Sequence, residues 1–305
     1  MRCRPRSLLA VSAAFALAGC GPAVVTPPSL VSGDASWQAL IRTMPSVAAT
    51  ASTNVCGVGS SACIRDVIAE MTRRYDGLAK RCSHEAPFAL MYLSVTQAVA
   101  TQGARRFQSS QYLNHLDAVF ANLYFTAYDN WRAGREQLVP EAWRIAFDAA
   151  DHETVATLGD MLLGMNAHIS RDLPFALARA GLVEPDGRSG QADFNSVNGL
   201  LGDVTSSMLR EEAHRFDPTL TSTVLPAIQL GPSNLQQVLS AWRSEAWRNA
   251  ERLLAARTPG QRAQVARTIE LGAAGRARLI ESLTSNLVIG PDAAERDAYC
   301  KGHRS

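Results

Sequence analysis

The sequence predicts an all-α fold. Long segments place apolar residues three and four positions apart, the spacing that lines one face of a helix. No segment alternates apolar and polar residues in the way that a half-buried strand does. Hydrophobic residues make up 47% of the chain, an ordinary share for a globular protein. We therefore expect a single globular multi-helix domain around one buried central helix.

The first residues form a targeting segment rather than part of this domain. Three arginines within the first six residues precede an apolar run, 8–18, that is too short to span a bilayer. The run closes in Leu17-Ala18-Gly19-Cys20, which resembles the lipobox of bacterial lipoproteins. The resemblance implies cleavage before Cys20 and lipidation of its thiol; the alternative is an ordinary signal peptide.

These features set the domain layout and the address. We predict a lipoprotein signal peptide over 1–19, a lipidated cysteine with a proline-rich tether over 20–33, and the helical domain over 34–305. Two or more acyl chains anchor a protein stably, and the resemblance to lipoproteins implies that the anchored domain faces the extracytoplasmic side of a membrane. Loss of the three arginines changes the formal charge from +2 to 2 − 3 = −1. A near-neutral protein has no electrostatic basis for binding nucleic acid, so we exclude that partner.

Four further cysteines remain in the exported protein. They are Cys56, Cys63, Cys82 and Cys300, and in an oxidising compartment they are expected to form two disulfides, for which three pairings can be drawn. Cys56 and Cys63 flank a short glycine- and serine-rich segment that can close on itself. We expect that local bridge, which leaves Cys82 to attach the tail through Cys300.

Helices are expected in chain order from the apolar spacing. Pro140 suits the first position of a helix, and Thr258 with Gln261 forms a capping box. The central helix is expected from Thr154 to Arg171, with Asp172 as the cap of a new short helix because Pro174 cannot continue the first one. The other expected helices cover 61–80, 85–103, 110–132, a segment after 140, 191–214, 234–256 and a segment after 258.

Three polar residues interrupt apolar helix faces and form the candidate catalytic or metal-binding set: Asp117, His168 and Asp172. Asp117 has apolar helical neighbours, so its carboxylate needs a partner, a cation or a raised pKa; the alternative is a face that reaches solvent. His168 and Asp172 are four residues apart and share one face of a continuous helix. Asp172 can accept the imidazole N–H, join His168 as a metal ligand, or cap a helix.

Other polar or small residues on these helices are candidates for a common pocket. Gly164 lies one turn before His168, where it allows either close helix packing or space above the imidazole. Asn166 points away from His168 on an ideal helix and is expected to serve a neighbouring helix. Asp193 and Asn198 interrupt the apolar face of the 191–214 helix in the same way.

Several segments together resemble one bacterial family, catalogued as domain of unknown function 5995. The resemblance covers about residues 65–255, its LLGMNAHIxxDLP core is fairly specific, and it implies a single helical domain without an established activity. The residues that it carries over are Asp117, Asn166, His168, Asp172 and Trp247. The segments are YLNHLDAVFANLYF (112–125), WRAG (131–134), PEAWRIAF (140–147), LLGMNAHISRDLP (162–174) and AWRNA (246–250).

A second similarity concerns a single helix. Gly-x3-His-x3-Asp followed by proline is similar to a helix of bacterial zinc phospholipases C and S1-type nucleases, where His and Asp four apart bind zinc. This chain has no His-x3-Glu and lacks the further histidines of their trinuclear site. At most a mono- or dinuclear, carboxylate-rich site is compatible with it.

Three functions compete on these observations. An enzyme would use Asp117, His168 and Asp172, with or without a divalent metal, on an ester or phosphoester. A binding protein would use the same pocket, lined by Met161, Met165, Phe120 and Trp247, for a lipid or small apolar ligand. A structural envelope lipoprotein would contain the trio as a buried hydrogen-bond hub and contact a protein partner.

Overall fold

The computed structural model describes residues 59–184, 186–222, 232–285 and 293–303. The predicted signal peptide, Cys20, the tether and Cys56 lie outside the described residues. Within the described ranges the secondary structure is helical, and the only β-pairing is two isolated bridges. The all-α prediction is confirmed.

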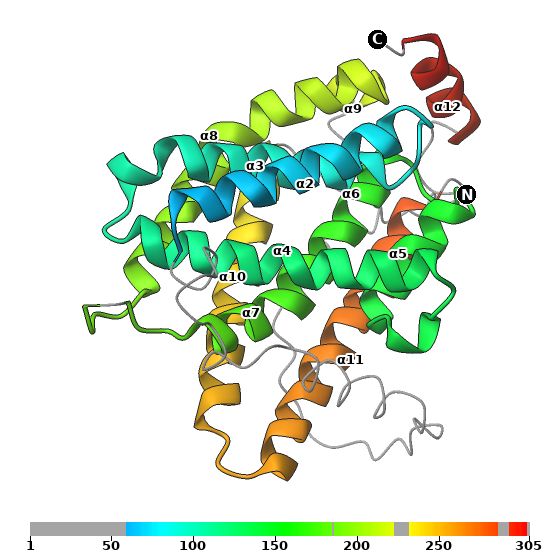
Figure 1. The fold of residues 1–305 in the computed structure, drawn as a ribbon. Helices are drawn as coiled ribbons and strands as arrows, with labels where there is room; N and C mark the ends of the chain where they lie inside the picture. Colours follow the sequence, from blue (N-terminus) through cyan, green and yellow to red (C-terminus); the bar gives the residue numbers. More distant parts are fainter. Residues whose placement is uncertain (1–58, 185, 223–231, 286–292, 304–305) are drawn as a thin grey trace, which may run out of the picture.

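The helices follow one another through short connections (Figure 1). Predicted and observed boundaries agree within a few residues for most of them, and the capping box of Thr258 and Gln261 is present. None of the described helices is long and apolar enough to cross a membrane. The elements are α2 Ser61–Ala79, α3 Ala86–Arg106, α4 Ser110–Arg132, the 3₁₀ turn η2 Glu136–Leu138, α5 Glu141–Asp151, α6 Thr157–Asn166, the π-helical segment η3 Ala167–Asp172, α7 Leu173–Ala180, α8 Gln191–Arg215, α9 Thr219–Ser222, α10 Pro232–Ala255, α11 Pro259–Thr284 and α12 Ala293–Gly302.

The segment α6–η3–α7 is the centre of the fold. It packs against α3, α4, α5, α10 and α11, so that neighbours surround it (Figure 1). Most of its side chains are buried, among them Met161, Leu163, Met165 and Leu177. A helix that is apolar nearly all round needs such an environment, and the prediction of a buried central helix is confirmed.

The course of this helix differs from the prediction in two respects. It begins at Thr157 rather than Thr154, and it does not stop at Arg171. The chain widens into a π-helical turn, in which the Leu173 N–H bonds to the His168 carbonyl, and then continues directly into α7. The wider turn accommodates Pro174 in place of a break, because a proline cannot supply the N–H of an α-helical turn. Asp172 lies at the N-cap position of α7, which ends before Gly181 as expected, but its side chain makes no capping hydrogen bond and its backbone is helical.

Close packing explains Gly164. A Cβ atom at this position would lie 2.4 Å from Cγ of Phe88, far inside a normal contact. The ring of Phe88 on α3 therefore occupies the space that a side chain would need, and α3 approaches the central helix closely. Of the two explanations for this glycine, helix packing is the one that the structure supports.

A disulfide attaches the C-terminal helix. Cys82, in the turn between α2 and α3, is bonded to Cys300 of α12, as predicted. Cys63 is also disulfide-bonded, and its predicted partner Cys56 lies outside the described residues. Helix α12 itself was not predicted, because its sequence shows no clear apolar stripe.

Candidate functional site

A cavity of about 90 Å³ lies beside the π-helical turn. Five helical segments contribute to its wall: α3, α4, the central helix, α8 and α10. Most of the wall is apolar, and three methionines, Met91, Met165 and Met208, belong to it. The polar side chains in the wall are Tyr92, Asp117, His168, Thr205 and Arg243.

His168 lies in this wall in an aromatic environment. Its ring stacks on Phe120 at 3.4 Å between centroids, with Tyr92 at 4.2 Å and Phe88 at 5.7 Å. Neither ring nitrogen has a hydrogen-bond partner among the described residues. Burial lowers the pKa of His168, with the nearby Asp172 opposing the shift, so the imidazole is neutral at pH 7.

Asp172 lies behind the histidine and does not line the cavity. Its Oδ2 accepts the indole N–H of Trp143 at 2.7 Å, and its Oδ1 accepts a guanidinium N–H of Arg171 at 2.7 Å. The distance from Oδ2 to Nδ1 of His168 is 3.7 Å, too long for a hydrogen bond. Arg171 also bonds Glu270 of α11 at 3.0 Å. Asp172 is therefore the centre of a buried polar network that joins η3 to α5 and α11.

Asp117 reaches the cavity from α4. Its Oδ2 is buried and has no hydrogen-bond partner among the described residues. Burial raises the pKa of Asp117 to about 7, and the nearby Tyr92 hydroxyl opposes the rise. At neutral pH a large share of this carboxyl group is therefore protonated. Asp117 and His168 thus line the same cavity, from α4 and from the π-helical turn.

Arg243 of α10 is a site residue that the sequence interpretation missed. Its side chain is buried, its Nε donates to Oδ1 of Asn198, and Nη2 donates to the carbonyl of Phe194, both at 2.7 Å. The guanidinium lies 4.2 Å from the centre of the Phe194 ring. No carboxylate among the described residues pairs with it, and burial alone lowers the pKa of Arg243 to about 10. It remains a cation at pH 7.

The other predicted pocket residues have structural roles. Asn166 donates to the carbonyl of Ala273 on α11 at 2.8 Å, as expected for a residue that serves a neighbouring helix. Asp193 accepts the backbone N–H groups of Gln108 and Ser109 at 2.8 and 2.6 Å, where α4 begins. The predicted pocket residue Trp247 packs on Phe194 and donates to Glu251, away from the cavity wall. Asn198 contributes indirectly, because it holds Arg243.

The predicted metal set is spread over two environments. Asp117 and His168 belong to the cavity wall, whereas Asp172 is engaged by Trp143 and Arg171. Within the described chain, the acidic and imidazole groups close enough to share one ion are His84, Glu153 and Asp297, and the predicted trio is not among them. The geometry thus gives no support to a metal bound by the trio, and a catalytic role for it stays a prediction.

Comparison with protein families identifies the family of this chain. A family model described as "Family of unknown function (DUF5995)" matches residues 64–283. The chain belongs to this family. The match includes the cavity wall and the π-helical turn, whereas α12 and Cys300 lie beyond it.

The family of this chain is identified by the match to the DUF5995 model. No curated protein and no solved structure matches the chain. The family carries no established activity, so the function has to be inferred from the cavity.

Proposed function

We propose that this DUF5995 protein binds a small amphiphilic ligand that combines a short apolar chain with one anionic end, such as a short-chain carboxylate. Arg243 is the observation that carries the proposal. A buried cation without an anion is costly in a folded protein, and such groups are normally paired. The cavity contains this cation in a mostly apolar wall, which is the arrangement that a monoanionic amphiphile complements.

The donors of Arg243 suit a carboxylate. A guanidinium has five N–H donors, of which Asn198 and the Phe194 carbonyl accept two. Those two bonds hold the plane of the guanidinium, and the remaining donors are available to a planar anion. Asp117 does not neutralise Arg243, because its buried Oδ2 has no hydrogen-bond partner among the described residues and burial raises its pKa to about 7.

The volume of the cavity limits the ligand to a short chain. A dry engineered cavity of roughly 150 Å³ admits benzene, and the present cavity of about 90 Å³ is smaller. Small displacements of Met91, Met165 and Met208 would enlarge it, because methionine side chains are unbranched and adapt to irregular space. We therefore expect the affinity to be greatest for carboxylates with about four to six carbons.

The test compares hexanoate with hexanamide, which has the same chain without the charge, by calorimetric titration of the purified protein. We expect hexanoate to bind more tightly than hexanamide. Arg243→Met should weaken hexanoate binding by at least about 30-fold, since truncating one partner of a buried charge pair costs roughly 2–5 kcal/mol. It should change hexanamide binding little.

Two further variants make this result interpretable. Arg210→Met removes an exposed arginine of α8 and should leave both affinities unchanged. Arg243→Lys keeps the charge but not the planar fork, so it should retain part of the preference for hexanoate. Equal binding of hexanoate by the Arg243→Met variant and the unmodified protein, or no binding of either ligand, would contradict the proposal.

Hydrolysis of an ester is a second candidate, and one observation favours it. A neutral histidine with free ring nitrogens and a carboxyl group with a pKa of about 7 line the same cavity, and general acid–base catalysis uses such groups. If the protein is an esterase, it should hydrolyse p-nitrophenyl butyrate, and His168→Leu should abolish this activity without loss of folding. A rate equal to that of buffer alone would leave binding as the function.

We further propose that the domain acts at a membrane, on the extracytoplasmic side, through lipidated Cys20. The lipobox-like sequence and the preceding apolar run support this anchor. Cys20→Ala is expected to abolish incorporation of a fatty-acid label and to leave an unprocessed precursor. Unchanged labelling of the variant would exclude lipidation at this cysteine.

A further inference from the structure

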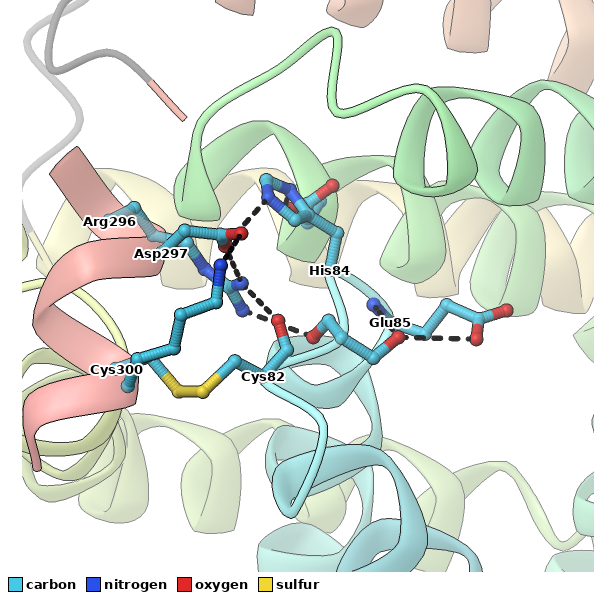
Figure 2. A network of polar contacts seen from close by, with 9 residues as sticks. Cys82, His84, Glu85, Arg296, Asp297 and Cys300 are labelled. Atoms are coloured by element: carbon cyan, nitrogen blue, oxygen red, sulfur yellow. Dashed lines mark hydrogen bonds and ion pairs between the residues drawn. A yellow bond between two sulfur atoms is a disulfide. The ribbon is translucent and has the colours of Figure 1, made fainter. Parts of the chain in front are cut away.

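A second polar centre lies at the opposite end of the central helix, where α12 meets the turn between α2 and α3 (Figure 2). Three residues with metal-ligating groups converge there: His84 of this turn, Glu153 of the α5–α6 connection and Asp297 of α12. One ligand atom from each lies within 4.8 Å of the other two. We propose that these three residues bind one divalent transition-metal ion, with Zn²⁺ as the expected metal.

His84 provides the main evidence. Its side chain is almost fully buried, and Nδ1 lies 2.7 Å from Oδ2 of Asp160 on α6. This contact favours a proton on Nδ1 and leaves Nε2 as a lone-pair donor. Nε2 has no hydrogen-bond partner among the described residues and lies 3.6 Å from Oδ1 of Asp297. A carboxylate behind a histidine that presents its other nitrogen to a cation is a common arrangement around zinc.

Asp297 is held in place from several directions. The disulfide between Cys82 and Cys300 joins α12 to the turn that carries His84 (Figure 2). Next to Asp297, the fully buried Arg296 donates to the carbonyls of Cys82 and Ser83. The structure thus fixes the position of Asp297 relative to His84 before any ion binds.

The charges around the site are compatible with a bound cation. Asp297 accepts bonds from Arg296 at 2.9 Å and from Lys301 at 3.1 Å, and a carboxylate has about four lone-pair positions for its partners. The Lys301 side chain is 54% exposed, so this contact is a weak surface pair that can yield to an ion. Asp160 and Glu153 add two further carboxylates near His84.

The types of ligand select the metal. One imidazole nitrogen with two carboxylate oxygens suits Zn²⁺, whereas Mg²⁺ prefers oxygen ligands alone. Three protein ligands leave the fourth position of a tetrahedral zinc ion for water. The site is separate from the cavity of Arg243 and does not depend on the proposed function, and one of its ligands lies beyond the residues that the family model matches.

The test is a titration of the full-length protein, freed of metal with EDTA, against Zn²⁺ and against Mg²⁺. We expect one equivalent of Zn²⁺ to bind and to raise the melting temperature, and Mg²⁺ to have no such effect. Glu153→Gln is the first variant, because Glu153 is exposed and its replacement leaves the core intact. It should weaken Zn²⁺ binding at least tenfold with only a small change of the melting temperature in the absence of metal, as is usual for an exposed side chain.

Three more variants complete the experiment. His84→Gln should abolish binding, and Asp160→Asn should weaken it by about 10–100-fold, because Asp160 orients the imidazole without touching the ion. His115→Ala, which removes a histidine of α4 outside this cluster, is the control and should bind as the unmodified protein does. No binding of Zn²⁺, or binding that survives both Glu153→Gln and His84→Gln, would overturn the proposal. In that case His84 serves only to bridge Asp160 and Asp297.

Discussion

Removal of the disulfide between Cys82 and Cys300 is expected to lower the free energy of unfolding by about 4–5 kcal/mol, because the bond restricts the unfolded chain over a separation of 218 residues. The appropriate variant is Cys82→Ser with Cys300→Ser, since a reductant would also open the bond that Cys63 makes. Urea unfolding followed by far-ultraviolet circular dichroism measures the loss.

The same variant should also release α12 locally. This helix buries Ala293, Arg296 and Cys300, a small area for a segment near the end of the described chain. Limited proteolysis should therefore cleave near α12 in the double variant at protease concentrations that leave the native protein intact. An unchanged urea midpoint together with unchanged proteolysis would show that α12 is held by packing alone.

Asp172→Ala is expected to destabilise the protein by about 3–5 kcal/mol, the usual cost of breaking a buried ion pair by removing one partner. Asp172 is fully buried, and its loss leaves the Trp143 indole N–H without an acceptor. It also leaves the buried Arg171 with Glu270 as its one carboxylate partner among the described residues. The urea midpoint gives the size of the effect.

A surface aspartate provides the matched control for this prediction. Asp148 of α5 has a side chain that is 59% exposed, and in the described part of the chain it pairs with His152, one turn later. Asp148→Ala should change stability by less than about 1 kcal/mol, as is typical of exposed pairs. If Asp172→Ala were equally mild, Asp172 would not be the centre of the buried network, and its role would have to be sought in the chemistry of His168.

Apolar spacing was sufficient to predict the fold class and most helices, because amphipathic faces record which side of each helix is buried. The course of the chain around Pro174 could not be predicted in this way. Proline normally ends a helix, and only packing around η3 stabilises the π-helical turn that accommodates it. Helix α12 was missed for a related reason: its position depends on a disulfide and on Arg296, not on an apolar stripe.

The site was predicted in part. Asp117 and His168 stood out because their helical neighbours are apolar, and both line the cavity. Arg243 gave no such signal, since a charged residue in a helix of mixed composition usually faces solvent. Its burial follows from the way α8 and α10 pack together, which a single sequence does not show. His84 likewise gave no signal in the sequence, because its burial depends on contacts with distant segments such as Asp297 of α12.

The central claim is that Arg243 binds the anionic end of a ligand inside the cavity of the helical domain. A crystal structure of the protein grown with hexanoate tests it most directly. The account predicts density for the apolar chain among Met165, Phe120 and Leu201, with the carboxylate within hydrogen-bond distance of the Arg243 guanidinium. An empty cavity at saturating hexanoate, or a chain bound with its carboxylate away from Arg243, would contradict it.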